Sequence, residues 1–390
     1  MARVLIIQAQ MKQYRVPFFL KLHDQLQAEG IGLRVAYSQA PSSEKARGDN
    51  GKLPDGLGVE VNAYWSLGDR FLYQPLLREI ANADLIIAEH ANKHLINHLL
   101  LLLRIAGRKR LGFWGLGANK QVGRSRLSEW YKRATARWVD LYFAYTVAAA
   151  REVAAWGVPP DRITAVQNAI DTREFQDHIV SVKNSELESV RLENGISKDA
   201  SVGLFCGMLD AVKSVPFLID CCKLIKKRVQ QFHLIIIGGG RQQSEVQVAI
   251  KDLPWVHMVG PKFGRDKALL FKLSDLFLLP GRVGLVILDA FAAGLPLVTV
   301  QIPIHGPEVE YLEDGVNGFI VPRDADIYAE IVVRLLQDRA SLLRLREGAL
   351  KSAGTYTLNA MADNFRAGVM RCLHGTTTQG VQCTVGSSSY

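Results

Sequence analysis

The apolar positions of the chain fall into two kinds of pattern. Short continuous apolar runs, typical of strands buried on both faces of a sheet, occur at 4–8 (VLIIQ), 84–90 (DLIIAEH) and 110–114 (RLGFW). Between them lie longer segments that favour helices, such as 17–29, which begins with a proline and precedes Gly30. The segment 71–82 is also predicted to be a helix. Strands that alternate with helices favour βαβ units, and therefore a mostly parallel, doubly wound sheet.

The same alternation starts again in the second half of the chain. Further strands are predicted at 202–207 (VGLFCG), 232–240 (FHLIIIGGG) and 275–280 (DLFLLP). The intervening segment 177–199 is polar and has no apolar period, so we interpret it as a linker. The chain is thus predicted to be an α/β protein with two Rossmann-like domains, residues 1–176 and 200–374, that face a central cleft. The last helix can pack back on the first domain, and the tail 375–390 is predicted to be disordered.

Length and composition agree with this picture. A chain of 390 residues with 48% hydrophobic and 22% charged residues is typical of a folded two-domain protein and not of a disordered one. No segment has the roughly 18–20 consecutive apolar residues that cross a bilayer, and 95–106 comes nearest. The chain starts with a predicted strand, and its five cysteines (206, 221, 222, 372 and 383) show no metal-binding spacing. We therefore expect a cytoplasmic protein with reduced thiols.

The positive charge of the chain is concentrated in one segment. The segment 104–137 holds ten Lys or Arg residues against one acid, Glu129, and so accounts for the whole formal net charge of +9. Such a segment favours an anionic partner (phospholipid, nucleic acid or a phosphorylated acceptor), although a solvated helix face has the same composition. It lacks interleaved aromatic stacking platforms, so we expect no nucleic-acid partner. Because the apolar segment 95–103 precedes it, we predict peripheral binding to an anionic membrane surface at the cytoplasmic face.

A candidate phosphate site follows the strand at 275–280. Gly281 and Gly284 form a loop, and a helix is predicted from Leu285 to residue 293. Free backbone N–H groups and the positive end of the helix dipole favour an anion at such a junction. Asp289 lies about one turn into this helix, where its carboxylate can accept hydrogen bonds from sugar hydroxyls. The alternative is an ordinary strand–glycine–helix junction with a solvated aspartate.

Residues 280–298 (PGRVGLVILDAFAAGLPLV) and 305–322 (HGPEVEYLEDGVNGFIVP) resemble the donor-site region of retaining glycosyltransferases of family 4, which have the GT-B fold. The chain keeps Pro280, Gly284 and Glu308 of the family pattern, together with the Asn-Gly pair at 317–318. It departs at the paired acids, since Gly281 stands in the place of the first and Asp289 replaces the second. The resemblance implies a nucleotide-sugar site that includes these residues and Leu285.

Two further loops of the second half resemble the same family. The segment 203–220 resembles its Gly-Arg-Leu-x-x-x-Lys-Gly segment, which makes Gly207 and Lys213 candidates for binding the donor phosphates, although Met208 stands in the place of the arginine. Lys213 is the predicted catalytic residue, since a lysine there can reach a diphosphate, and the alternative is a surface lysine. Gly238 and Gly239 follow the next strand and either approach the nucleotide or form a tight turn without a ligand.

Three residues of the first half are predicted to face the acceptor. Trp114 lies in a segment (113–120) that resembles a Trp-Gly-His-Gly segment of one family branch, with Leu116 in place of the histidine, and it either stacks on a sugar or packs. His90 ends a strand beside Glu89 and is either an acceptor contact or structural. Arg15 lies in a segment (14–19) that resembles Tyr-Arg-x-Pro-Phe-Phe of the same branch.

The resemblance implies a hexosyltransferase-type enzyme that moves a sugar from a nucleotide diphosphate sugar to an acceptor hydroxyl with retention. The expected acceptor is a glycan or a lipid-linked molecule of bacterial-type cell-surface polysaccharide or glycolipid assembly. No carboxylate pair of metal-ligand spacing lies near the predicted donor loops, so we expect activity without a metal or other cofactor. The departures at Met208, Leu116, Gly281 and Asp289 leave a second interpretation, a GT-B-like protein that binds nucleotide or glycan with weak or no turnover.

Overall fold

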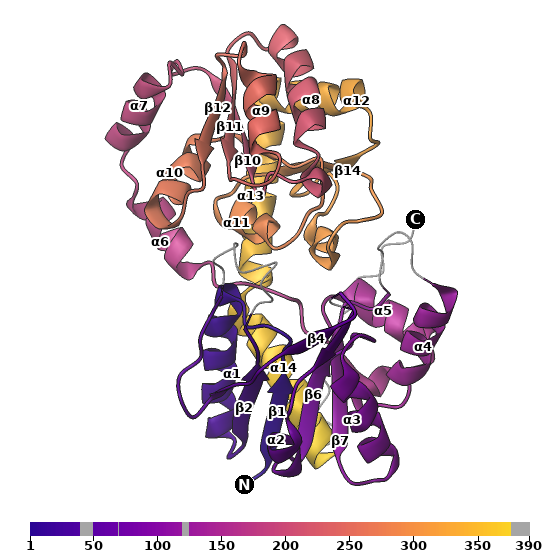
Figure 1. Cartoon of the computed structure of the whole chain (residues 1–390). Coiled ribbons are helices and arrows are strands. Elements are labelled where there is room, and N and C mark those ends of the chain that lie inside the picture. The colour runs from indigo at the N-terminus through magenta and orange to yellow at the C-terminus, as the bar shows by residue number, and fades with distance from the viewer. Residues whose placement is uncertain (40–49, 69, 119–124, 376–390) are drawn as a thin grey trace.

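The computed structural model describes residues 1–39, 50–68, 70–118 and 125–375, and it has two α/β domains, one above the other in Figure 1. Each domain is built on one sheet in which every recorded strand pair is parallel. This arrangement confirms the predicted fold class of two Rossmann-like domains.

The sheet of the N-terminal domain has seven strands in the order β3-β2-β1-β6-β7-β8-β9. Val4 of β1 pairs with Leu33 of β2 on one side and Leu85 of β6 on the other, so the chain winds outward in both directions from β1. The strand order therefore reverses between β1 and β6, and ligands of such sheets bind at the carboxyl ends beside this point. The strands are β1 (Arg3–Ile7), β2 (Gly32–Tyr37), β3 (Gly58–Glu60), β6 (Leu85–Glu89), β7 (Arg110–Gly115), β8 (Leu141–Ala144) and β9 (Ile163–Ala165).

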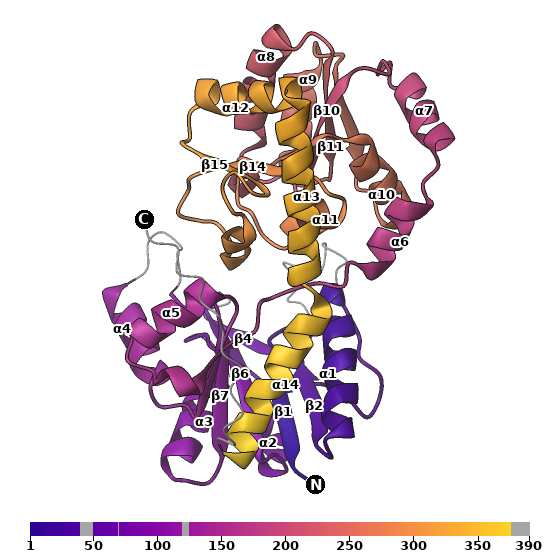
Figure 2. The same ribbon diagram turned by 180° about the vertical axis from the view of Figure 1, so that it is seen from behind.

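Helices cover both faces of this sheet (Figures 1 and 2). They are α1 (Val16–Ala28), α2 (Leu77–Ala81), α3 (Leu95–Ile105), α4 (Arg126–Ala136) and α5 (Val147–Ala155). The prediction of a helix over 71–82 is wrong in its first part, because β5 (Phe71–Tyr73) pairs antiparallel with β4 (Tyr64–Ser66). The aromatic rings of Tyr64 and Tyr73 lie 6.2 Å apart across this hairpin, and such cross-strand pairs stabilise strands.

The sheet of the C-terminal domain has six strands in the order β12-β11-β10-β13-β14-β15. The order reverses between β10 and β13, so the loops that follow these two strands lie side by side at the carboxyl edge. The elements are β10 (Ser201–Cys206), α8 (Val215–Arg228), β11 (Phe232–Ile237), α9 (Gln243–Ile250), β12 (Val256–Gly260), α10 (Gly264–Leu273), β13 (Leu276–Leu278), α11 (Val286–Ala292), β14 (Leu297–Val300), β15 (Gly318–Val321), α12 (Ala325–Gln337) and α13 (Arg339–Thr355).

The chain passes between the domains twice. The first passage leads into α6 (Arg173–Ser181) and α7 (Asn184–Glu193), so the segment interpreted as a linker is largely helical. The second leads from α13 into α14 (Leu358–His374), which lies along the N-terminal domain (Figure 2). There Phe365 stacks on Phe143 with ring centroids 4.0 Å apart. The tail from residue 376 onward lies outside the described residues.

Candidate active site

A cavity of about 590 Å³ lies between the two domains, in the predicted cleft. The N-terminal domain lines it with the loops after β7 and β8 and the start of α5, and the C-terminal domain with the loops after β10, β13 and β14. Its lining residues include Leu116, Thr146, Ala148, Glu152, Val212, Arg282, His305, Gly306 and Glu310. Both sheets thus present their carboxyl edges to one space, as expected for ligand binding in open α/β sheets.

Lys213 ends a short 3₁₀ turn, Ala211–Lys213, that follows β10. Its Nζ donates a hydrogen bond of 2.7 Å to the backbone carbonyl of Arg282, and the Arg282 N–H donates one of 2.7 Å to the carbonyl of Val212. These bonds join the loops after β10 and β13 and place two cationic residues together. Burial lowers the pKa of Lys213 from its ordinary value, while the Asp210 carboxylate opposes this shift. The result is a half-buried cation next to two residues, Val212 and Arg282, that line the cavity.

Gly281 is enclosed by the same pair of loops. A Cβ atom built on it would lie 2.2 Å from the backbone carbonyl carbon and oxygen of Lys213, so no side chain fits without displacing that loop. This packing explains why an acid is missing where the family pattern has one. Gly284 has open space around its Cα, and α11 begins two residues later, at Val286. The helix has seven residues and is close to the predicted bounds.

The glycines after β10 and β11 pack against one another. A Cβ atom on Gly238 would lie 1.9 Å from the carbonyl oxygen of Gly207, and Gly238 has a φ of 143°. The tight-turn alternative therefore accounts for Gly238 by itself. Gly239 accepts a hydrogen bond at its carbonyl from the Leu209 N–H, which holds this turn to the Lys213 loop, and a side chain on Gly207 would contact Lys213.

Asp289 is paired, which neither interpretation of the sequence foresaw. It is 9% exposed, and its Oδ2 lies 2.7 Å from Nζ of Lys267 on α10. Lys267 Nζ also lies over the ring of Phe175, 5.0 Å from its centroid. Sequence reasoning missed Lys267, although its place four residues before the buried Phe271 puts both on one face of α10. In this structure the carboxylate offered to a sugar is thus already engaged by a cation.

Glu308 lies at the contact between the domains. It is 5% exposed, and its Oε1 accepts a hydrogen bond of 2.6 Å from Nδ2 of Asn168 in the N-terminal domain. Burial raises the pKa of its carboxyl, and the Asn168 hydrogen bond opposes this shift. Its Oε2 would lie 2.6 Å from a Cβ built on Gly306, which places the carboxylate beside the donor loop. Asn168, which was not among the predicted site residues, also accepts at its backbone carbonyl from the hydroxyl of Tyr311.

Of the acceptor-side candidates, Trp114 and His90 are both buried, and both line a second cavity of about 500 Å³ that Glu89 also lines. Trp114 is 1% exposed and packs against Phe365 with ring centroids 5.1 Å apart, which favours its packing alternative, and stacking on a sugar stays a prediction. His90 lies between the hydroxyls of Tyr142, 3.0 Å from Nδ1, and Thr135, 3.3 Å from Nε2. Burial, and next the charge of Lys132, lower the pKa of His90 well below its ordinary value, so the ring is neutral.

Arg15 is buried behind these residues. Its guanidinium carbon lies 4.4 Å from the centroid of the Trp114 ring, and its Nη2 donates to the Tyr145 hydroxyl over 3.0 Å. Its Nη1 is buried without a hydrogen-bond partner among the described residues. Burial raises the pKa of the Glu89 carboxyl, and the charge of Arg15 opposes this shift. Glu89 itself lines the second cavity of about 500 Å³ with Lys93, Lys132 and Tyr145, next to Leu116 of the cleft.

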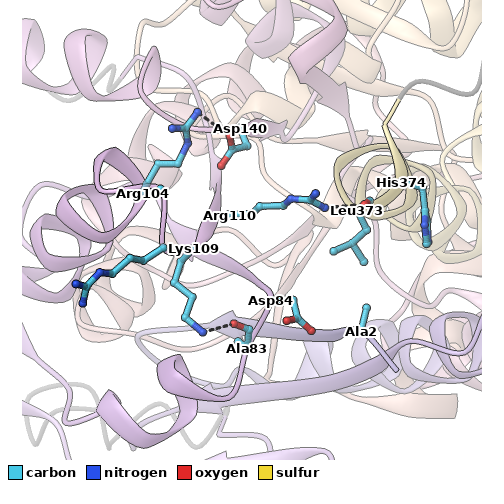
Figure 3. A pocket seen from close by; sticks show the side chains of 11 residues that line it. Ala2, Ala83, Asp84, Arg104, Lys109, Arg110, Asp140, Leu373 and His374 are labelled. Atoms are coloured by element: carbon cyan, nitrogen blue, oxygen red, sulfur yellow. Dashed lines mark hydrogen bonds and ion pairs between the residues drawn. The ribbon is translucent and has the colours of Figure 1, made fainter.

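The basic segment begins at the opposite edge of the same sheet, where a hollow of about 610 Å³ lies at the amino ends of the strands (Figure 3). Lys109 Nζ donates to the carbonyl of Ala83 over 2.6 Å, and Arg110 Nη1 to that of Leu373 at the end of α14 over 2.6 Å. Arg104 pairs with Asp140 at 2.7 Å. Part of the charge surplus therefore holds the domain and α14 together. Lys120 and Arg124 lie outside the described residues.

Comparisons with known proteins agree with this geometry. Residues 18–174 match the family model described as Glycosyltransferase Family 4, and residues 200–338 match that of Glycosyl transferases group 1. The chain is 25% identical over 202 residues to the amylovoran biosynthesis glycosyltransferase AmsK of Erwinia amylovora, covering 48% of this chain and 46% of that protein. It is 23% identical over 335 residues to the alpha-D-kanosaminyltransferase of Streptomyces kanamyceticus, covering 81% and 78%. The chain thus spans about half the length of the first relative.

Solved structures show the same fold. A glycosyltransferase of Rickettsia africae superposes with a TM-score of 0.71 at 13% identity, covering 96% of this chain and 99% of the other. The HepE protein of Anabaena, in complex with UDP-glucose, superposes with a TM-score of 0.65 at 18% identity, covering 96% and 100%. The expected GT-B arrangement of the two domains is thereby confirmed.

Proposed function

Because this chain belongs to the glycosyltransferases of family 4 and group 1 and has their GT-B fold, we propose that it transfers a sugar from a nucleotide diphosphate sugar to an acceptor hydroxyl with retention. The observation that carries the proposal is the pair of cationic residues, Lys213 and Arg282, held together at the cleft by the loops after β10 and β13. In such a transfer a nucleotide diphosphate leaves while positive charge develops on the sugar. Fixed cations at the leaving phosphates stabilise that transition state.

The remaining residues of the cleft would position the two substrates. Gly281, Gly284 and Leu285 shape the donor loop, and Glu308 fixes that loop against the N-terminal domain through Asn168. Asp289 is proposed to hold the ribose, which requires that it share its carboxylate with Lys267 or exchange that partner. Glu89 and the cavity after β6 would meet the acceptor, with Arg15 behind them. Holding both substrates in one geometry lowers the entropic part of the barrier.

We further propose that the transfer needs no metal ion, since the cationic residues are placed where the diphosphate charge would be met. The sequence does contain one Asp-x-Asp triplet, Asp324 to Asp326. In the structure, Asp324 caps α12 and accepts from the N–H groups of Asp326 and Ile327. Transfer measured with EDTA is expected to match transfer without it, and abolition by EDTA with rescue by Mg²⁺ or Mn²⁺ would contradict this proposal.

The acceptor is proposed to be a glycan or lipid-linked molecule of bacterial-type cell-surface assembly, reached at the cytoplasmic face of a membrane. Two observations support this. The Erwinia relative is named for the biosynthesis of amylovoran, and a structure that superposes with a TM-score of 0.60 at 15% identity is that of WaaG, a glycosyltransferase involved in lipopolysaccharide biosynthesis. The surplus positive charge of this chain lies wholly in the segment 104–137 of the N-terminal domain, which begins at the amino edge of the sheet and whose Lys132 lines the cavity of Glu89.

A second candidate function, nucleotide or glycan binding without turnover, is favoured by Gly281 alone, because its packing leaves no room for the acid that the family pattern carries there. Thermal unfolding with UDP-, GDP- and CDP-linked sugars, followed by detection of released nucleotide diphosphate and glycosylated product, separates the two. A ligand at one hundred times its Kd stabilises the folded state by about 2.7 kcal/mol. We expect one nucleotide class to give such a shift and also to yield product. A shift without product would favour the binding protein, and no shift from any donor would contradict both.

A further inference from the structure

The outer surfaces of α3 and α4 expose large apolar side chains that the proposed transfer does not use. Leu102 and Ile105 of α3 are 64% and 61% exposed, and Leu127 and Trp130 of α4 are 71% and 64% exposed. Trp138, just after α4, is 47% exposed and Leu95, which opens α3, is 40% exposed. Exposed apolar side chains gathered on one surface mark an interaction site, whereas scattered single ones do not.

These side chains form one stripe on each helix, and the two stripes adjoin. In helices, residues three, four or seven apart share a face, which groups Leu95, His98, Leu102 and Ile105 on α3, and Leu127, Trp130 and Tyr131 on α4. Trp138 lies in the turn that follows α4. His98 Nδ1 lies 2.6 Å from the Tyr131 hydroxyl, so the stripes meet at that contact. Both helices lie on the same flank of the N-terminal domain in Figures 1 and 2. We call this surface, made of Leu95, Leu102, Ile105, Leu127, Trp130 and Trp138, the α3–α4 face.

Cations border the α3–α4 face. Arg108, Arg126 and Arg133 are exposed, and none of the three has an ion-pair partner among residues 1–39, 50–68, 70–118 and 125–375. The only acid in the segment 104–137 is Glu129. A tryptophan-bearing apolar surface with an arginine border matches the boundary between phospholipid phosphates and acyl chains. None of the described helices is long and apolar enough to cross a bilayer.

We propose that the α3–α4 face inserts into an anionic phospholipid surface, with its apolar side chains at the acyl boundary and its arginines at the phosphates. Asn92 and Ser128, which line the cavity of Glu89, lie at the start of the same two helices and are joined by a hydrogen bond of 2.8 Å. The inserted face would therefore bring the mouth of the acceptor side to the membrane. This consequence rests on the proposed function, whereas the insertion itself does not.

Tryptophan fluorescence tests the insertion, because Trp130 and Trp138 are exposed, whereas Trp65 is half-buried and Trp114, Trp156 and Trp255 are buried. With vesicles of phosphatidylglycerol and phosphatidylcholine, we expect a blue shift and quenching by brominated acyl chains. The double variant Leu127→Ser/Trp130→Ser should bind these vesicles at least about tenfold more weakly, because two apolar side chains no longer insert. The affinity of Arg126→Gln/Arg133→Gln for these vesicles should fall about twenty-fivefold, roughly fivefold for each arginine, and its preference for phosphatidylglycerol should be lost.

Leu192→Ser on α7 is the matched control, since Leu192 is 84% exposed but lies far along the chain from both helices, and its vesicle binding should equal that of the parent. Vesicle binding without quenching by brominated chains would overturn the proposal. So would full binding by Leu127→Ser/Trp130→Ser, or a dimer in vesicle-free solution that this variant abolishes, which would assign the face to a second copy of the chain. Donor-dependent thermal shifts measured on the same variants keep the two proposals apart. Quenching without any donor shift leaves the insertion standing and removes the proposed transfer.

Discussion

Lys213 is the residue on which the proposed transfer depends most directly. Its ammonium group is held beside the cleft by the Arg282 carbonyl, and burial lowers its pKa because the charge is poorly hydrated. Replacing it leaves the leaving phosphates without this cation. Lys213→Ala should therefore raise the transition-state free energy by about 2–4 kcal/mol, which lowers kcat/KM roughly 30- to 900-fold. Lys223→Ala, which removes a half-exposed lysine paired with Asp220 on α8, is the control and should leave transfer unchanged. A loss below about threefold for Lys213→Ala would contradict the assignment.

The pair of Asp289 and Lys267 gives a prediction about stability. Their side chains are only 12% and 19% exposed and meet at 2.7 Å, so removing one partner leaves the other charge largely buried. Asp289→Asn should therefore lower the free energy of unfolding by about 3 kcal/mol, measured by urea denaturation. The double variant Asp289→Asn/Lys267→Met should recover a large part of that loss, since no unpaired charge remains. A loss in the double variant equal to the sum of the losses in Asp289→Asn and Lys267→Met would show that the pair is not coupled.

At this scale, the sequence indicated some site residues and not others for a physical reason. Lys213, Gly281 and Gly284 lie in loops next to apolar strands, where local pattern is informative. Lys267 and Asn168 act through contacts with residues distant in sequence, Asp289 and Glu308, and no local pattern reports such contacts. Trp114 was open to two interpretations because an aromatic residue at the end of a strand fits both, and its burial favours packing although it lines the cavity of Glu89.

At the scale of elements, apolar runs predicted most strands of the two sheets, because strands buried on both faces need continuous apolar sequence. The β4–β5 hairpin was missed because its strands have three residues each, too few to show a period. The helix α7 has no buried side chain and carries no clear apolar stripe, and the predicted linker boundary at 177 divided α6 between Phe175 and Ile179. α14 was recognised as a helix, but its docking surface is known only from packing, where Phe365 meets Phe143, Phe18 and Trp114.

That docking of α14 predicts a large loss when it is weakened. Phe365 is 0% exposed, so Phe365→Ala removes a fully buried ring from the contact between α14 and the first sheet. The free energy of unfolding should fall by about 3–5 kcal/mol in urea denaturation. Leu343→Ala on α13 truncates a side chain that is 50% exposed, so it should change the free energy of unfolding by less than about 0.5 kcal/mol. If Phe365→Ala lost no more than Leu343→Ala, α14 would not be a structural part of the N-terminal domain.

At the scale of the whole molecule, the two domains are joined by α14, by the first passage through 166–173 and by the turn Pro307–Tyr311 of the C-terminal domain. In that turn, Glu308 accepts from Asn168, and Glu310 accepts from the N–H of Ala148 at the start of α5 over 2.8 Å. The sequence predicted two domains and a cleft from repeated βαβ units. It could not predict this contact, because the carboxylates of the turn have the composition of an ordinary exposed loop.

Buried histidines in both domains predict how the stability of the whole molecule depends on pH. Burial, followed by the charge of Lys93, lowers the pKa of His94 in the N-terminal domain to about 4. In the C-terminal domain, burial, followed by His257, lowers the pKa of His233 to about 4. The unfolded chain takes up protons at about pH 6.5, where the folded state does not, so stability is full above that pH and is lost as the pH falls toward 4. For His94 the loss between pH 7 and pH 5 should be about 2 kcal/mol. Urea denaturation at pH 7 and pH 5 measures the free energy of unfolding of the parent and of His94→Gln. Between these pH values, the loss in the variant should be smaller than that in the parent by about 2 kcal/mol. An equal loss in both proteins would show that His94 takes up its proton in the folded state.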